Sequence, residues 1–349
     1  MLESEKEIKQ HLKEIKRIAS KIKDKQGDKT ITLMEICGGH TNVIMKYGIR
    51  DLLPRNIRLI SGPGCPVCVS SQKDIDCMIE LAHQGVPVAT YGDMLRVPGS
   101  KYSLDDARAK YGKVFEVYST TEVLELKKKH PDIVFFGIGF ETTAPMSAFL
   151  LKNKVAVYSV HKLVPPAVEI LASDKDIKID GFISPGHVST IIGRKAYDNI
   201  RVPQAVSGFT PERILRGIRV LLELIRDKKM ITVNAYPEAV KEEGNVVAQK
   251  LLQETFIITD SDWRGLGTLP KSGLEVRDDS LNAKKIYAKI LSKVPEPKKT
   301  GCRCGEILKG TIGPQECPLY RKSCTPENPV GACMVSEEGS CAIAYRYGK

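Results

Sequence analysis

Short apolar runs alternate with helical patterns along most of this 349-residue chain, and that alternation restricts the fold more than any other feature. Strands that alternate with helices favour parallel sheets joined by right-handed crossovers. The expected strands lie at 31–36, 57–60, 86–90, 114–118, 133–138, 155–160, 181–184 and 204–207. The sequence therefore predicts an α/β protein in which two domains with parallel sheets face one cleft.

We expect the domains to follow one another along the chain. An amphipathic helix over 1–29 precedes α/β domain I (30–121) and α/β domain II (122–240), and a cysteine-rich domain occupies 241–349. The last domain is predicted to contain a helix over 245–255, a strand over 256–259, a Gly-rich connection over 262–270 and a helix over 281–291. Its final part has little periodicity, so we expect its cysteines to organise it.

The net charge of +11 comes mainly from two stretches, 1–29 with nine Lys/Arg against six Asp/Glu, and 281–309 with eight against two. Aromatic residues make up only 6% of the chain, and none interleave with basic runs. This pattern favours a solvated basic face, or a dock for an acidic protein, over nucleic-acid binding. No apolar run approaches the roughly 20 residues that span a bilayer, and the first residues are too polar for a signal peptide. We expect a cytoplasmic protein without a membrane partner.

The ten cysteines form two groups, four between residues 37 and 77 and six between 302 and 341. In a reducing compartment, clustered cysteines more often bind metal or carry out redox chemistry than form structural disulfides. We interpret Cys77, in a predicted helix, as a small core residue. The other nine cysteines are candidates for a metal-binding or redox site.

Polar motifs follow the predicted strands, at the edge where α/β sheets place ligands. Cys37-Gly-Gly-His40 combines a thiol and an imidazole with glycines that let a ligand approach, although a buried structural cysteine also fits. Cys65-Pro-Val-Cys68 fits a dithiol/disulfide couple, half a zinc site or two ligands of a transition metal. Glu141, His161 and His187 also follow strands, as site residues or as satisfied structural groups.

The tail cysteines leave three kinds of site open. Cys302 and Cys304 are too close for two easy ligands of one zinc ion, and the remaining spacings are wide. Four thiolates out of six fit a [4Fe–4S] cluster and would leave one thiol pair over. Zinc, or free and disulfide-bonded cysteines, are the alternatives. The six are Cys302, Cys304, Cys317, Cys324, Cys333 and Cys341.

Taken together, these motifs resemble the HypD family of hydrogenase maturation proteins over nearly the whole chain. The residues that carry the resemblance are Glu35-Ile-Cys37-Gly-Gly-His40-Thr41, Gly62-Pro-Gly-Cys65-Pro-Val-Cys68, Gly139-Phe-Glu141-Thr-Thr143, Pro185-Gly-His187-Val-Ser189 and the spacing C-x14-C-x6-C-x16-C. The resemblance implies two α/β domains, a part that holds a [4Fe–4S] cluster, and a scaffold on which the Fe(CN)2CO group of [NiFe] hydrogenases is assembled. It also implies two partners, the small chaperone HypC and the cyanide donor HypE.

The resemblance also implies roles for individual residues. Cys37 would bind the iron being assembled, with Cys65 and Cys68 as nearby redox or iron-binding thiols. We add His40, Glu141 and His187 as candidate catalytic residues and leave the roles of Glu141 and His187 open. The implied cluster ligands are Cys302, Cys317, Cys324 and Cys341, which leaves Cys304 and Cys333 as a dithiol. Two positions depart from the family pattern, Asn42 where a second His is common and Ser71 where Pro is common.

Two other functions fit part of the sequence. A cluster-fed reductase of protein disulfides would use Cys65, Cys68 and the tail but would give Cys37 no task. A zinc-stapled binding protein would need no redox chemistry. For the maturation factor we expect a monomer that forms a one-to-one complex with its chaperone, and we leave open whether it turns over as an enzyme.

Overall fold

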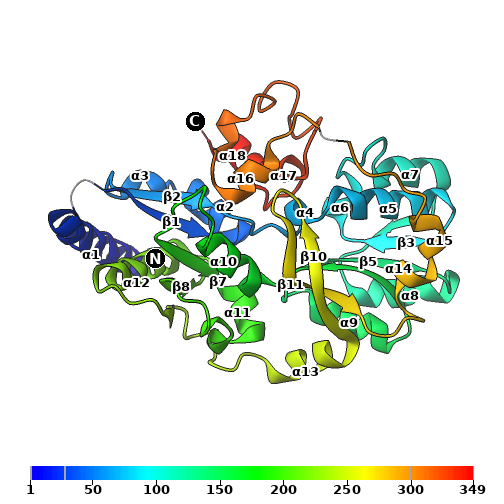
Figure 1. Cartoon of the computed structure of the whole chain (residues 1–349), viewed down its shortest axis with the longest axis horizontal. Helices are drawn as coiled ribbons and strands as arrows, with labels where there is room; N and C mark the ends of the chain where they lie inside the picture. The colour runs from blue at the N-terminus through cyan, green and yellow to red at the C-terminus, as the bar shows by residue number, and fades with distance from the viewer. Residues whose placement is uncertain (1, 27–28, 299, 349) are drawn as a thin grey trace.

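Two parallel sheets form the body of the protein in the computed structural model, which describes residues 2–26, 29–298 and 300–348. Sheet A has the strand order β2-β1-β7-β8-β9 and sheet B the order β4-β3-β5-β6, with every neighbouring pair parallel (Figure 1). The predicted α/β class with parallel sheets is confirmed. The strands of sheet A are β1 (Ile31–Glu35), β2 (Ile57–Ser61), β7 (Gly181–Pro185), β8 (Gln204–Ser207) and β9 (Thr232–Asn234); those of sheet B are β3 (Val88–Thr90), β4 (Val114–Glu116), β5 (Val134–Gly139) and β6 (Ala156–His161).

Helices cover both faces of the sheets, which explains why strands such as β1 and β5 are buried along their whole length. On sheet A, the buried face of α12 meets the apolar stripe of α1, including Ile15, Ile18 and Ile22. Each fully buried side chain of this kind contributes about 1.5–3 kcal/mol. The helices of the body are α1 (Leu2–Gln26), α2 (Gly38–Lys46), α3 (Ile49–Leu52), α4 (Pro66–Val69), α5 (Gln72–His83), α6 (Gly92–Leu95), α7 (Leu104–Tyr111), α8 (Thr120–Lys129), α9 (Ala144–Lys152), α10 (Val164–Ala172), α11 (Gly186–Ile192) and α12 (Pro211–Arg226).

The division between the sheets does not follow the predicted boundary between residues 121 and 122. After β2 the chain leaves sheet A, builds all of sheet B over 88–161, and returns to sheet A at β7. The free edge of β1 then pairs with β7, with Leu33 opposite Gly181. Spacing along the sequence shows where strands form, but the pairing is decided by which strand edges meet in space.

The segment after β9 differs from the prediction in two places. The expected Gly-rich connection over 262–270 is mostly strand, because β10 (Phe256–Trp263) turns directly into β11 (Gly267–Val276) as an antiparallel hairpin against β6. The helix expected over 281–291 is two short helices, α14 (Ala283–Ile286) and α15 (Ala288–Leu291), separated at Tyr287. The predicted helix over 245–255 is confirmed as α13 (Val246–Thr255).

The cysteine-rich tail lies across the body of the protein at the end of sheet A. Its helices are α16 (Cys304–Lys309), α17 (Ala332–Val335) and α18 (Ser340–Tyr347), with a 3-10 turn at Pro314–Glu316. The tail contacts α2 through α18 and α4 through α17, and it is the orange and red segment at the top of Figure 1. The two cysteine groups of the sequence are therefore brought together.

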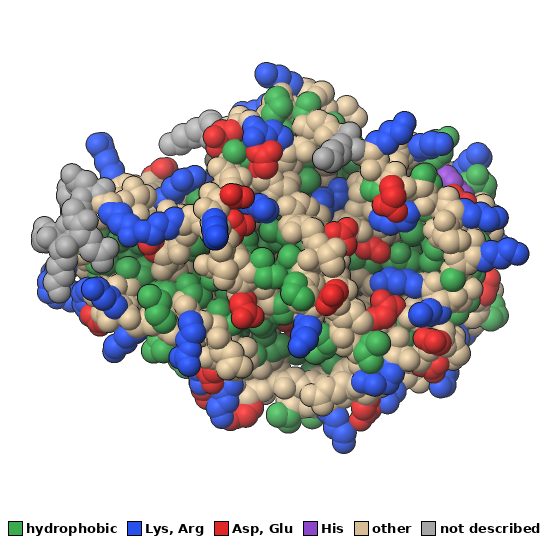
Figure 2. Space-filling view, viewed as in Figure 1, with side chains coloured by type: hydrophobic (Ala, Val, Ile, Leu, Met, Phe, Trp, Pro, Cys, Tyr) green, Lys and Arg blue, Asp and Glu red, His purple; other side chains and the backbone are tan. Residues whose placement is uncertain are grey.

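The surface carries mixed charge. Figure 2 shows Lys and Arg side chains interspersed with Asp and Glu over the face in view, with apolar side chains between them. Among the described residues, no helix is both long enough and apolar enough to cross a membrane.

Candidate functional site

Cys37 lies at the junction between β1 and α2, at the carboxyl edge of sheet A. It is the N-cap residue of α2 and is half-buried. Burial raises the pKa of its thiol to about 12, and the Glu338 carboxylate adds to that rise, while the backbone N–H groups of Gly39 and His40 oppose it. The thiol therefore keeps its proton at neutral pH unless a metal ion displaces it.

A buried carboxyl group, that of Glu35, is hydrogen-bonded to the Cys37 loop. Glu35 accepts the N–H of Cys37 at 3.2 Å and a short hydrogen bond from the Thr41 hydroxyl. Burial raises the pKa of Glu35 to about 7, against the opposing effects of hydrogen bonds from Ser61 and Thr41. The sequence analysis used Glu35 only as part of a motif. The available signal was one acidic residue at the end of a mostly apolar strand, two positions before the cysteine.

Glycines let three segments meet at Cys37. The N–H of Gly38 donates to the Gly64 carbonyl at 3.1 Å, and a Cβ added to Gly64 would lie 2.2 Å from the Cys37 nitrogen. A Cβ on Gly38 would lie 2.3 Å from the Cβ of Glu338 in the tail. Neither backbone position leaves room for a side chain, so the Cys37 loop, the Cys65 loop and the tail are in direct contact.

Cys65 and Cys68 form a disulfide at the start of α4, with their Cα atoms 5.2 Å apart. Both are buried, and the N–H of Cys68 donates to the Cys65 sulfur at 3.2 Å. α4 packs against β5 on one side and against α17 of the tail on the other. Of the three chemistries that the spacing allows, this arrangement fits a dithiol/disulfide couple between the two sheets and the tail.

His40 and His187 stack on opposite sides of one aromatic ring. The ring of Phe209 lies 4.6 Å from that of His40 and 3.8 Å from that of His187. The His40 Nε2 donates to the Ser207 carbonyl at 3.2 Å, and burial lowers the pKa of His40 to about 4, so the ring is neutral. Its buried Nδ1 has no hydrogen-bond partner among the described residues and is free to accept one.

The stack connects both predicted histidines to the Cys37 loop through Phe209, whose ring would lie 3.0 Å from a Cβ at Gly39; His40 is buried and His187 is exposed. Phe209, which follows β8 at the same sheet edge, was missed by the sequence analysis. Its only signal was its position after a strand.

Glu141 follows β5 and belongs to the same region. One carboxyl oxygen accepts the N–H of Val164 at 2.9 Å, and the other is buried without a partner in the described part of the chain. Burial raises the pKa of Glu141 to about 7. Burial also raises the pKa of Tyr197, and the charges of Glu141 and Cys37 both add to that rise. Glu141 is thus an acid poised near neutral pH whose charge acts on the same tyrosine as that of Cys37.

His161 and Cys77 lie in the core. His161 is fully buried, bonds the Ser147 hydroxyl at 2.7 Å, and has a pKa lowered to about 3 by burial. Cys77 is buried in α5, in agreement with its interpretation as a core residue. Both residues are therefore structural groups of the core and are not part of the thiol site.

Five of the six tail cysteines line one small cavity. Apolar side chains of Ile307, Leu319 and Met334 complete its wall, together with Cys302, Cys317, Cys324, Cys333 and Cys341. Cys304 is buried beside it, hydrogen-bonded to both Cys302 and Cys333. No group of three or more His, Cys, Asp or Glu among the described residues is arranged to hold a single metal ion. The cavity is lined instead by thiols from several parts of the tail and by an apolar wall.

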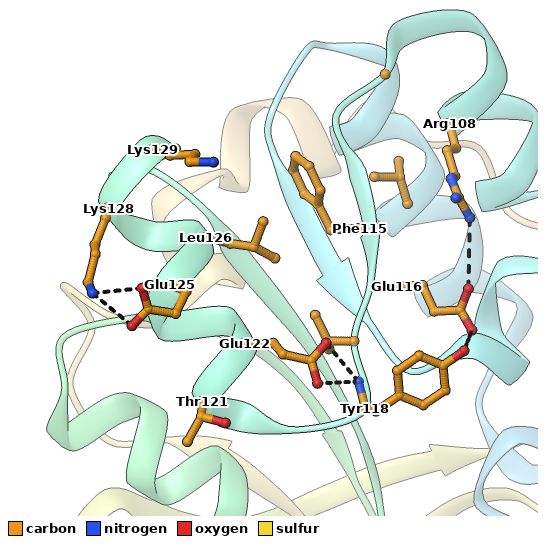
Figure 3. Close-up of a pocket in the computed structure, with 13 residues that line it drawn as sticks. Arg108, Phe115, Glu116, Tyr118, Thr121, Glu122, Glu125, Leu126, Lys128 and Lys129 are labelled. Atoms are coloured by element: carbon orange, nitrogen blue, oxygen red, sulfur yellow. Dashed lines mark hydrogen bonds and ion pairs between the residues drawn. The ribbon is translucent and has the colours of Figure 1, made fainter.

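A separate hollow of about 980 Å³ lies at the edge of sheet B, between β4 and α8 (Figure 3). The Tyr118 N–H donates to the Glu122 carboxylate, and the Tyr118 hydroxyl donates to Glu116 at 2.8 Å. In the described chain its wall contains no cysteine or histidine. This hollow is therefore distinct from the thiol site.

Comparisons with known proteins agree with the geometry. The family model described as "HypD: Hydrogenase formation hypA family" matches residues 8–348. A hydrogenase expression/formation protein of Methanocaldococcus jannaschii is 41% identical over 353 residues, covering 97% of each chain. The hydrogenase maturation factor HypD of Azotobacter vinelandii is 41% identical over 91% of this chain and 89% of its own length. That of Escherichia coli K12 is 38% identical over 92% and 90%.

Proposed function

The chain belongs to the HypD family and acts in hydrogenase maturation, and from that premise we propose that it carries the iron of a hydrogenase site on Cys37 while the iron receives its CN and CO ligands. The observation that carries this proposal is the meeting of three segments at Cys37, where glycine contacts bring the Cys65–Cys68 disulfide and the cysteine tail to one half-buried thiol.

Cys37 has the chemistry of an iron anchor. Thiolates are suitable ligands for iron, and metal binding replaces the proton that burial otherwise keeps on this thiol. Glu35 and the neutral His40 lie next to Cys37, and His40 can donate or accept hydrogen bonds but stays unprotonated at neutral pH. The carboxyls of Glu35 and Glu141, with pKa values raised to about 7, can accept or return protons near neutral pH as the cargo Fe(CN)2CO is built.

The reduced Cys65–Cys68 pair can release cyanide from a thiocyanate on the donor protein. One thiolate attacks the thiocyanate sulfur, cyanide leaves with the electron pair of the broken S–C bond, and a mixed disulfide forms. The second thiolate displaces the donor thiol, which takes up a proton, and closes the Cys65–Cys68 disulfide. The pair is oxidised by two electrons, which a reductant must return before the next round. The disulfide form of the pair in the structure supports this role.

We propose that the tail holds a [4Fe–4S] cluster on Cys302, Cys317, Cys324 and Cys341, leaving Cys304 and Cys333 as a dithiol. The support is the shared cavity, to which each of the four ligands contributes, and its apolar wall. When bound, the cluster would supply single electrons beside α17, which packs on the helix of the disulfide. The partners we propose are the chaperone HypC, in a one-to-one complex that shares the iron, and the cyanide donor HypE.

Replacing Cys37 by Ser tests the iron anchor. Because an alkoxide is a harder and far more basic ligand than a thiolate, C37S isolated anaerobically with its chaperone should lose the CN and CO infrared bands and hydrogenase maturation. It should keep its fold and its brown colour. Normal occupancy of Fe(CN)2CO in C37S would reject the proposal and make Cys65 or Cys68 the better candidate.

Replacing Cys317 by Ala tests the cluster. C317A should lose iron, sulfide and the broad absorption near 400 nm, whereas C77A, a matched change of a buried cysteine outside the cavity, should keep all three. Full iron and sulfide in C317A would show that the ligand set is wrong.

A stand-alone disulfide reductase remains the second candidate, favoured by the observed Cys65–Cys68 disulfide. It predicts that C37S reduces a protein disulfide as fast as the wild type and supports normal maturation.

A further inference from the structure

Arg264 lies at the tip of the β10–β11 hairpin and binds the segment that follows the Cys65–Cys68 motif. Its backbone N–H donates to the Val69 carbonyl at 2.9 Å, and its Nε donates to the Ser70 carbonyl at 2.8 Å. Its Nη1 donates to Gln72 at 2.9 Å. Two hydrogen bonds from the guanidinium and one from the backbone therefore hold Arg264 against the end of α4, which carries the disulfide.

The same turn touches the cysteine tail. Gly265 has φ +79 and lies so close to Gly305 that an added Cβ would be 2.1 Å from the Gly305 Cα. Arg264 lines a hollow together with Cys302 and Cys304. The hairpin tip thus separates the disulfide motif from the first two tail cysteines and touches both sides.

One end of the guanidinium has no partner. The Nη2 of Arg264 is buried and meets no hydrogen-bond acceptor among the residues that the structure describes. This group is a buried cationic donor that lacks an acceptor and lies next to the thiols of Cys302 and Cys304. Such a donor can stabilise a negative charge that forms on the tail.

We propose that Arg264 is a positioning residue that locks the disulfide motif to the tail and supplies a fixed positive charge that stabilises the reduced, more negative state of the tail's redox centre. This inference rests on the proposed cluster. Reduction of an iron–sulfur centre adds one negative charge, and nearby charge and hydrogen bonds to sulfur set the potential at which that electron is accepted. Removing the guanidinium should therefore move the midpoint potential to a more negative value.

The test compares three full-length variants purified anaerobically, with the cluster reduced stepwise by dithionite and followed by electron paramagnetic resonance. R264Q removes the charge, and R264K keeps the charge but loses the fork of hydrogen bonds. R303Q is the control, because Arg303 directly follows Cys302 in the sequence but is partly exposed and already paired with Glu306. We expect a negative shift in R264Q, a smaller shift in R264K and the smallest shift in R303Q, where solvent screens the charge. Urea unfolding of each variant measures separately how much stability is lost with the hydrogen bonds of Arg264.

Outcomes for the cluster and for Arg264 can be told apart. A colourless wild type without a resonance signal would overturn the cluster proposal and this inference with it. A brown R264Q with the wild-type midpoint would overturn the inference alone, as would equal shifts in R264Q and R303Q. Equal losses of stability in R264Q and R264K, with a full potential shift only in R264Q, would support a charge effect beyond the hydrogen bonds.

Discussion

Replacing Glu141 by Gln should stabilise the protein increasingly as the pH rises, relative to the wild type. Glu141 is 2% exposed, and one of its carboxyl oxygens has no partner in the described chain. A glutamine can keep the hydrogen bond from Val164 but carries no charge to bury. The wild type must instead hold an ionised carboxylate in its interior once the pH exceeds the pKa of the group.

The magnitude follows from the pKa, which burial raises from the usual 4.5 to about 7. Below pH 4.5 the carboxyl is protonated in both the folded and the unfolded chain, so its contribution to stability is fully present. Between pH 4.5 and 7 only the unfolded chain loses its proton, and stability falls by about 1.4 kcal/mol for each pH unit. The loss is complete above pH 7 and amounts to about 3 kcal/mol.

Urea unfolding at pH 5 and at pH 8 measures this effect. The difference in free energy of unfolding between E141Q and the wild type should grow by about 2–3 kcal/mol between the two pH values. The unpaired amide of the glutamine costs about 1–3 kcal/mol, but that cost is the same at both pH values and cancels. As a control, E125Q on the exposed face of α8 should show the same difference from the wild type at pH 5 and pH 8.

A difference for E141Q that does not change with pH would refute the reasoning, because it would mean that the buried carboxyl titrates as an exposed one does. If Glu141 also moves a proton during assembly of the cargo, E141Q should fold well at pH 8 and yet support less maturation. Such a loss in a more stable variant could not be ascribed to unfolding.

Three further outcomes are expected. G38A should lose about 1–3 kcal/mol of stability and expose the tail to protease, because its Cβ would collide with Glu338, whereas G39A, which meets only the ring edge of Phe209, should lose less in both assays. The free energy of unfolding of F209L should fall by about 0.5–1.5 kcal/mol more than the lost buried area accounts for, and the NMR signals of His40 should broaden. Unchanged His40 signals would show that the stack does not hold this ring. Oxidative removal of the cluster should leave the far-ultraviolet circular dichroism of the sheets nearly unchanged while the tail becomes sensitive to trypsin; an equally resistant tail would contradict its organisation by a metal group.

Much of the body could be predicted because its signals are local. Short apolar runs located the eight expected strands of the two sheets to within about two residues. The short β9 and the second strand of the hairpin were missed, since a Gly-rich stretch such as 262–270 carries no periodicity.

The sequence by itself singled out the candidate residues of the site, because Cys37, the Cys65–Cys68 pair and Glu141 follow predicted strands and the tail cysteines are clustered. The α/β class was likewise determined by short apolar runs that alternate with helical patterns. Both are properties of short segments and need no knowledge of what lies across the core.

Only the tertiary structure decided how these parts meet. The pairing of β1 with β7, the ring of Phe209 between two histidines, the approach of Glu338 to Gly38, and the place of Arg264 between the disulfide and the tail all join residues far apart in the chain. Such contacts depend on which strand edges and apolar faces find each other during folding, and local spacing contains no measure of that. The pKa values near 7 of Glu35 and Glu141 have the same origin, since burial is created by the surrounding elements.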